Sequence, residues 1–196
     1  MGKLSFKQYR AIDLGIMAVI LCVFETITAT AAVEWFPQEL YTLSPTIAVV
    51  CIVMMRWGGY AAIHAVAGGA AFCAASGASA QQFVIYCAGN CLALAAMLLF
   101  RMRGKGGVKE SAFLTAAFAA AAYIGAQLGR GLIGLFFGGT PAAALLFFTT
   151  DSLSLLFAIV VVLISRRADG LFEDQRAYLI RMQEERRRRQ NEEYYE

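Results

Sequence analysis

The sequence predicts an all-α integral membrane protein: a bundle of six transmembrane helices with a cytoplasmic C-terminal helical tail. Of its 196 residues, 59% are hydrophobic and 16% are charged, and the mean hydropathy is +0.60. These values are typical of membrane proteins rather than of soluble cores. The charges are also segregated, at the N-terminus, in residues 101–110 and after Ile164. The apolar runs between them are the expected membrane spans.

Six spans are expected, and short connections join them. The second span is short for the roughly 20 residues that a perpendicular span needs. Between spans we expect a polar and aromatic loop at 34–44, tight turns at 56–59 and 138–141, a small loop at 76–81 and a solvated basic connector at 101–110. The transmembrane domain covers residues 1–165 and the charged tail residues 166–196. The expected spans are residues 11–33, 45–55, 60–75, 82–100, 111–137 and 141–164.

The distribution of lysine and arginine predicts the orientation. Positive residues mark the cytoplasmic side of a membrane protein, and the expected outer loops contain none. Both termini are therefore expected in the cytoplasm, with the chain in the cell membrane. The inner segments hold Lys3, Lys7, Arg10, Arg56, Arg101, Arg103, Lys105, Lys109, Arg166 and Arg167.

Two charged residues stand inside the last two spans. Arg130 precedes the turn at 138–141 and Asp151 follows it, so a rise of about 1.5 Å per residue puts both roughly 10–15 Å inside the same membrane face. Charges in a span are costly and indicate function, with a partner expected. Glu25 in the first span and Asn90 in the fourth lie at about the same depth.

Polar groups and aromatic rings share helical faces at this depth, as they do in small-molecule pockets. Tyr86 and Asn90 share one face, and Tyr123, Gln127 and Arg130 share another. Two other interpretations remain open: Arg130 pairs with Asp151 or Glu25 merely to hold helices together, or the cluster relays protons or ions. The candidate substrate-binding residues are Glu25, Trp35, Tyr86, Asn90, Tyr123, Gln127, Arg130 and Asp151.

Enzymatic chemistry finds no support in the sequence. There is no GxSxG or HExxH motif, no Walker motif and no nucleic-acid motif. The five cysteines lack metal-ligand spacing with histidine. We therefore expect no catalytic residues, no metal, no cofactor and no nucleic-acid partner.

The stretch MRWGGYAAIHAVAGGAAF at residues 55–72, together with the six spans and the basic N-terminus, carries a resemblance. Over residues 10–165 the chain resembles the S component of an energy-coupling-factor (ECF) vitamin transporter. That resemblance implies a subunit that captures a vitamin or related micronutrient from outside. The pocket is then built from the first outer loop and spans four to six. Uptake is driven by ATP through a transmembrane coupling subunit and ATPase subunits.

The resemblance also implies docking on the coupling subunit through small residues in span one. Ala11, Gly15 and Ala18 match this pattern partially. A second stripe, Ala61, Ala65 and Gly69, has the spacing that allows close helix approach, so it is also expected to dock a partner. In the tail, the basic block at 186–189 is expected to meet anionic membrane lipid. The long tail departs from the family, so the alternative is a structural or regulatory membrane protein that recruits cytoplasmic partners through its tail.

Overall fold

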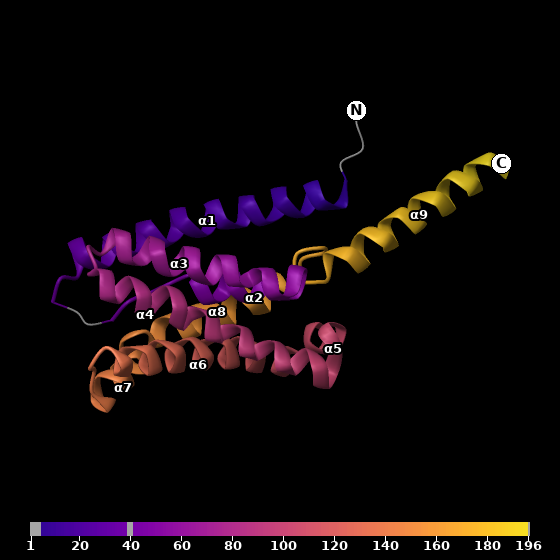
Figure 1. Ribbon diagram of the computed structural model, residues 1–196. Coiled ribbons are helices and arrows are strands. Elements are labelled where there is room, and N and C mark those ends of the chain that lie inside the picture. The colour runs from indigo at the N-terminus through magenta and orange to yellow at the C-terminus, as the bar shows by residue number, and fades with distance from the viewer. Residues whose placement is uncertain (1–4, 39–40, 196) are drawn as a thin grey trace.

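The computed structural model describes the backbone of residues 5–38 and 41–195, and every regular element in these ranges is a helix (Figure 1). Side chains are described for these residues except 186 and 189–195. The elements are α1 (Phe6–Trp35), α2 (Thr46–Trp57), the 3-10 turn η1 (Gly58–Tyr60), α3 (Ala61–Ala75), α4 (Ala80–Asn90), the 3-10 segment η2 (Cys91–Met97), α5 (Leu98–Glu110), α6 (Ala112–Phe136), α7 (Pro141–Thr150), α8 (Ser152–Ser165) and α9 (Gln175–Tyr195).

The helices are compatible with a multi-pass membrane protein. In the described part of the chain, four helical stretches are long and apolar enough to cross a membrane. They are Phe6–Trp35, Thr46–Ala75, Ala80–Glu110 and Ala112–Phe136. The pair α7 and α8, bent by 44°, makes a fifth if it counts as one span. The expected six spans are therefore matched only to four or five.

The stretch Thr46–Ala75 explains this difference in number. Gly58 has φ 61° and ψ −127°, a conformation that glycine adopts readily, and it ends α2. Beyond it α3 packs back against α2. The two helices have 12 and 15 residues, so each is shorter than the roughly 20 that cross a bilayer.

The connections gather at two ends of the bundle, because the helical stretches α1, α2, α3, α4–α5, α6 and α7–α8 run in alternating directions (Figure 1). At the first end, which we call the Arg56 end, Arg56 Nη1 donates to the carbonyl oxygen of Gly170 at 2.6 Å. At the second, the Thr42 end, the Thr42 amide donates to the Thr150 carbonyl at 2.9 Å. The connections at the Arg56 end contain lysine and arginine, and those at the Thr42 end contain none.

The core is centred on α2 and α6. Residues 46–48 and 50–56 of α2 are all buried, and they pack against α3, α6 and α8. By contrast, α1 lies at the edge of the bundle (Figure 1) and buries only Leu21, Glu25 and Ala29, which are four residues apart on one face. Its other faces expose isoleucine and valine, an apolar surface that suits lipid.

Glycines let α4 and α6 approach closely. A Cβ atom added to Gly129 would stand 2.2 Å from the carbonyl oxygen of Gly89. One at Gly125 would stand 2.6 Å from the Leu92 oxygen. Gly125 and Gly129 are four residues apart, the spacing that brings membrane helices into backbone contact. This contact fixes the register between the two helices.

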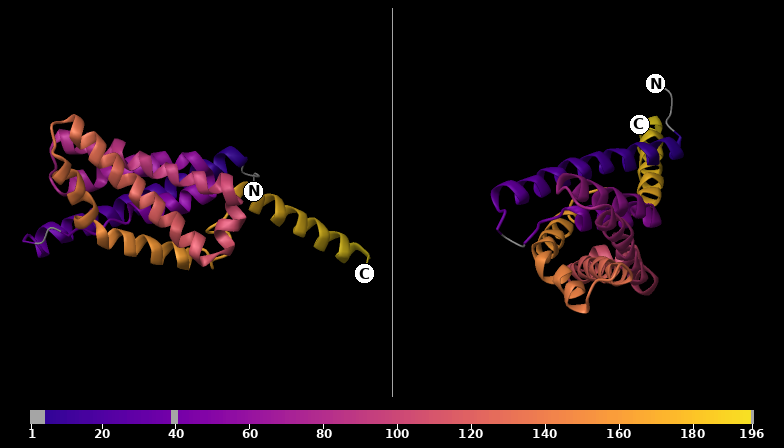
Figure 2. Two further views of the ribbon diagram at one scale, coloured as in Figure 1. Left: turned by 90° about the horizontal axis from the view of Figure 1, so that it is seen from below. Right: turned by 60° about the vertical axis from the view of Figure 1, so that its left-hand side comes forward.

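Polar contacts tie the segment after α8 to the Arg56 end. Arg56 binds both carboxylate oxygens of Asp13, at 3.0 and 2.6 Å, and Phe172 is fully buried. Lys109 pairs with Glu173 and Lys105 with Asp174. Burial alone raises the pKa of both carboxyls, but hydrogen bonds and these lysines outweigh it and hold each pKa below its usual value. Beyond this segment, α9 projects from the bundle (Figure 2).

Three sequence expectations are corrected. Residues 101–110 belong to helix α5, with a break at Gly104 (φ 68°), rather than forming an irregular connector. Residues 141–164 form two helices that meet at Asp151 instead of one. The first helix starts at Phe6, because Ser5 caps it together with Gln8, so part of the expected basic segment is helical.

We predict that Gly129→Ala lowers the thermal unfolding midpoint in detergent. The added methyl meets backbone rather than a movable side chain, and overpacking of this kind costs roughly 1–3 kcal/mol. Gly106→Ala is the matched control, since its Cβ would meet nothing within 4 Å. In an exposed helix that change is expected to be neutral or mildly stabilising. Equal midpoints for the two variants would contradict the close α4–α6 contact.

Candidate functional site

A buried ion pair joins α6 to the break between α7 and α8. Arg130 Nη1 lies 2.8 Å from Asp151 Oδ2, and both side chains are almost fully buried. Gln127, one turn before Arg130, donates to the same carboxylate oxygen at 2.6 Å and accepts from Arg130 at 3.1 Å. Ser154 donates to the other oxygen, Oδ1. Asp151 is thus held from α6 and from α8.

Arg130 is held on two further sides. Its Nε donates to Asn90 Oδ1 at 2.8 Å, and Asn90 Nδ2 in turn donates to the Ala65 carbonyl at 3.2 Å. Its guanidinium carbon lies 4.4 Å from the centre of the Tyr86 ring, a cation–π contact. Tyr86 also stacks on Phe72, with ring centres 4.9 Å apart. The guanidinium is therefore oriented by α3, α4 and α6 together.

Glu25 forms the second carboxylate of the site. Its side chain is 0% exposed. Oε2 accepts hydrogen bonds from Ser44 Oγ at 2.9 Å and Thr46 Oγ1 at 2.6 Å. Thr46 is the first residue of α2, whose N-terminal end carries a partial positive charge that favours a carboxylate. Gly68 leaves the room for Thr46, since a Cβ there would stand 2.2 Å from Thr46 Oγ1.

Interrupted helices bring these groups to one place. Residues 41–45 enter the bundle as non-helical backbone before α2 begins (Figure 1). Irregular backbone at such depth is stable only when protein or a polar cavity satisfies its polar groups. Here the Ser44 amide donates to Ser154 Oγ at 2.7 Å. Because Ser154 also binds Asp151, residues 41–45 link the Glu25 carboxylate to the Asp151 carboxylate.

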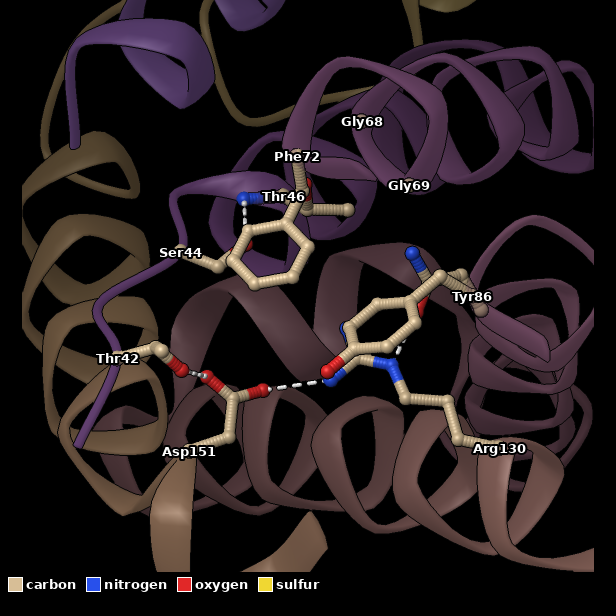
Figure 3. Close-up of a pocket in the computed structure, with 10 residues that line it drawn as sticks. Thr42, Ser44, Thr46, Gly68, Gly69, Phe72, Tyr86, Arg130 and Asp151 are labelled. Atoms are coloured by element: carbon tan, nitrogen blue, oxygen red, sulfur yellow. Dashed lines mark hydrogen bonds and ion pairs between the residues drawn. The ribbon is translucent and has the colours of Figure 1, made fainter. Parts of the chain in front are cut away.

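A small cavity lies between these groups, and Figure 3 shows the side chains that converge on it. Its empty volume is about 210 Å³, but side chains leave only about 10 Å³ for the centre of a water molecule. That is room for about one water. The lining mixes hydroxyls, two glycines, two aromatic rings and the ion pair: Thr42, Ser44, Thr46, Gly68, Gly69, Phe72, Tyr86, Asn90, Arg130 and Asp151.

The two buried arginines of the bundle differ in how they are used. Arg56 engages Nε, Nη1 and Nη2, with Asp13 and two backbone carbonyls. Arg130 engages Nε and Nη1. Within the described part of the chain, Arg130 Nη2 has no hydrogen-bond acceptor, and Arg130 lines the cavity. Arg56 therefore serves packing alone, whereas Arg130 keeps donor capacity next to open space.

The structure brings together six of the eight predicted site residues. Glu25, Tyr86, Asn90, Gln127, Arg130 and Asp151 belong to the network. Tyr123 lies one turn from Gln127, but its hydroxyl donates to the Phe148 carbonyl and it does not line the cavity. Trp35 is 74% exposed at the end of α1, away from the cavity. The structure therefore does not place Trp35 in the cavity, because α1 continues to Trp35 and carries it outward.

Sequence reasoning missed most of the cavity lining. Thr42, Ser44 and Thr46 lie in or beside the loop expected at 34–44, of which residues 39–40 fall outside the described ranges. The sequence signal was available in part, since TLSPT at 42–46 places three hydroxyls around a proline. Gly68 and Phe72 also line the cavity without being predicted, and Gly69 is predicted only as part of a small-residue stripe.

The predicted docking residues divide into two sets. Ala11 and Gly15 are exposed and Ala18 is half-buried on α1, which leaves them accessible to another helix. Ala61, Ala65 and Gly69 are instead buried inside the bundle. A Cβ at Gly69 would stand 3.0 Å from the Tyr86 backbone. The second stripe therefore packs α3 within the chain and is corrected as a docking surface.

The comparisons with known proteins add no relative. The chain matches no family model, no curated protein and no solved structure. The proposed function therefore rests on the geometry of the site and on the resemblance of the sequence to S components.

We predict that Arg130→Met sharply destabilises the protein, because it leaves Asp151 buried without its partner. Breaking a buried pair in this way costs roughly 3–5 kcal/mol. Adding Asp151→Asn removes the stranded charge and is expected to restore much of the thermal unfolding midpoint. Arg181→Met is the control, since that side chain is half-exposed in its pairs with Asp169 and Glu173 and such pairs contribute about 0–1 kcal/mol. Additive effects of the two site mutations would rule out the coupling.

Proposed function

We propose that this chain is the substrate-capture subunit of an ECF-type transporter, which binds a vitamin or related micronutrient from outside for ATP-driven uptake. The observation that carries the proposal is the chemistry of the cavity. An arginine with a remaining donor lies over a tyrosine ring, beside a second aromatic ring and three hydroxyls. Such a lining suits a small molecule with a ring and polar substituents.

The cavity has room for about one water in this structure, so binding of a larger molecule requires it to widen. The segment 41–45 is its movable wall, because it has no helical hydrogen bonds of its own. Its holding contacts are Thr42 to Thr150, Ser44 to Ser154 and Ser44 to Glu25. A ligand that replaces these contacts opens the wall without unfolding any helix. Lids that close over substrate work in this way.

The proposed topology has six passes with both termini in the cytoplasm. In this arrangement α2 and α3 form two short passes. Helix α2 is covered by α3, α6 and α8, and α3 packs against α1, α2 and α4. The Arg56 end faces the cytoplasm and the Thr42 end faces outside, because the sequence places lysine and arginine at the first and none in the loops of the second. The cavity then opens toward the outside.

The proposed partners are a transmembrane coupling subunit and ATPase subunits. The exposed face of α1 around Ala11, Gly15 and Ala18 is the proposed docking surface, because small side chains let a partner helix approach. The basic residues of the tail are proposed to lie against anionic lipid.

We predict that the full chain, extracted from its native membrane in mild detergent, carries a small molecule detectable by native mass spectrometry. Tyr86→Leu removes the ring beneath Arg130 without stranding a charge, so bound ligand is expected to fall at least tenfold. Tyr60→Leu is the matched control, because Arg10 lies over that ring at 4.3 Å, at the other end of the bundle. It is expected to leave the bound fraction unchanged.

A wild-type protein without bound ligand, both as extracted and after incubation with cell extract, would contradict the capture function. Full retention by Tyr86→Leu would remove the cavity as the binding site. Deleting residues 184–196 should leave binding intact, since the contacts of α9 with the Arg56 end include Tyr178 and Arg181, which lie before residue 184.

We predict the topology from cysteine labelling in a background without the five native cysteines. Ser79→Cys, in the connection before α4, should react with an impermeant maleimide in intact cells. Gly106→Cys, on α5, should react only after permeabilisation. Both positions are exposed, so failure to label reports sidedness rather than burial. The opposite pattern would reverse the membrane orientation.

A second candidate function is a structural or regulatory membrane protein, and one observation favours it. The helix α9 projects away from the bundle (Figure 2) and offers charged residues to a partner. In that case cytoplasmic proteins bind to α9, and deletion of residues 184–196 removes them while the bundle stays folded.

A further inference from the structure

The Glu25 carboxylate has one oxygen without a partner. Oε2 takes both available hydroxyls, those of Ser44 and Thr46. Oε1 is buried and has no hydrogen-bond donor in the described part of the chain. A buried charged oxygen without a partner is costly, and such atoms in a folded protein call for an unseen ion or ligand. The ion pair between Arg130 and Asp151 provides no partner for this oxygen.

The charges of the site do not balance. Glu25 and Asp151 bring two negative charges, and Arg130 brings one positive charge that is already bonded to Asp151. The N-terminus of α2 offsets roughly half a charge at Glu25. At Asp151 the negative end of α7 meets the positive end of α8, so the two helix ends cancel. The remaining negative charge sits on Glu25.

We propose that Glu25, with the hydroxyls of Ser44 and Thr46, binds a sodium ion. The three side chains offer only oxygen atoms, which hard cations prefer. They stand beside the non-helical backbone of residues 41–45, and unwound backbone is where broken membrane helices coordinate sodium. The ion occupies the unpaired Oε1 and supplies the missing positive charge.

The charge and size of the site select a monovalent ion. One carboxylate whose charge is only partly offset is neutralised by a single positive charge, whereas a divalent ion would leave a larger excess charge in a buried place. Calcium takes six to eight oxygens, commonly from several carboxylates. Because the space bounded by Ser44 and Thr46 holds about one water, the ion binds without its hydration shell. At contact distance a carboxylate attracts the smaller sodium ion more strongly than the larger potassium ion.

The site also couples the ion to the cavity wall. Ser44 and Thr46 bound the non-helical segment, and Ser44 reaches Asp151 through Ser154. An ion at Glu25 therefore fixes the same backbone that closes over the cavity. This consequence holds whether or not the cavity binds a micronutrient.

The test measures thermal unfolding of the full chain in detergent while sodium chloride replaces N-methylglucamine chloride at constant ionic strength. A ligand that binds the folded state raises the midpoint as its concentration passes Kd. We expect a saturable rise with sodium and little or none with potassium. Ser44→Ala, which keeps the carboxylate and removes one oxygen, is expected to shift the half-saturating sodium concentration at least several-fold upward.

Two glutamine variants separate the site from general salt effects. Glu25→Gln removes the charge with little change in shape and is expected to abolish the sodium-dependent rise. Glu34→Gln is the matched control, the same change on an exposed glutamate of α1, and should keep it. If Glu25→Gln does not fold, Ser44→Ala still decides the outcome. Equal midpoints in sodium, potassium and N-methylglucamine would overturn the proposal, as would a sodium effect that Ser44→Ala and Glu25→Gln leave unchanged.

Discussion

The buried pair of Arg130 and Asp151 constrains the rest of the structure. A charge that far inside an apolar bundle is tolerated only with a partner and full hydrogen bonding. Meeting that requirement draws Asn90 from α4, Gln127 from α6 and Ser154 from α8 to one depth. It also fixes the bend, because Asp151 sits between α7 and α8 where their axes differ by 44°. The apolar surfaces determine that the helices pack, and the ion pair determines in which register.

The glycines extend this constraint to the backbone. Gly129 immediately precedes Arg130 on α6, and Gly89 immediately precedes Asn90 on α4. The close contact between the two glycines therefore brings Asn90 next to Arg130. Without that approach, Arg130 Nε could not reach Asn90 at 2.8 Å. The contact between the two glycines and the hydrogen bond between Arg130 and Asn90 therefore depend on each other. A change in either is expected to displace the other.

The all-helical class and the central pair could be predicted from the amino-acid sequence. Charges within apolar runs are rare, and the rise per residue of a helix gives the depth of each charge in the membrane. Three features could not be predicted in this way. The lengths of α7 and α8 depend on a helix break at Asp151, and the apolar runs on either side of it do not reveal that break. The burial of Ala61 and Ala65 depends on which helix covers them, and a small-residue stripe does not state this. Thr42 and Ser44 join the site through a non-helical path, which has no period to detect.

The two arginines show how stability and function can be told apart in such a bundle. Arg56 is bonded at Nε and at both terminal nitrogens, to Asp13 and to two backbone carbonyls, which uses four of its five N–H donors. Arg130 is as deeply buried, yet it lines a cavity with Nη2 turned to no acceptor among the described residues. Among the described residues, Arg130 Nη2 is not one of the buried polar atoms that lack a partner, so it stays accessible from the cavity. An accessible donor beside open space can bind a ligand, which is the physical reason to place the proposed recognition at the Thr42 end and fastening at the Arg56 end.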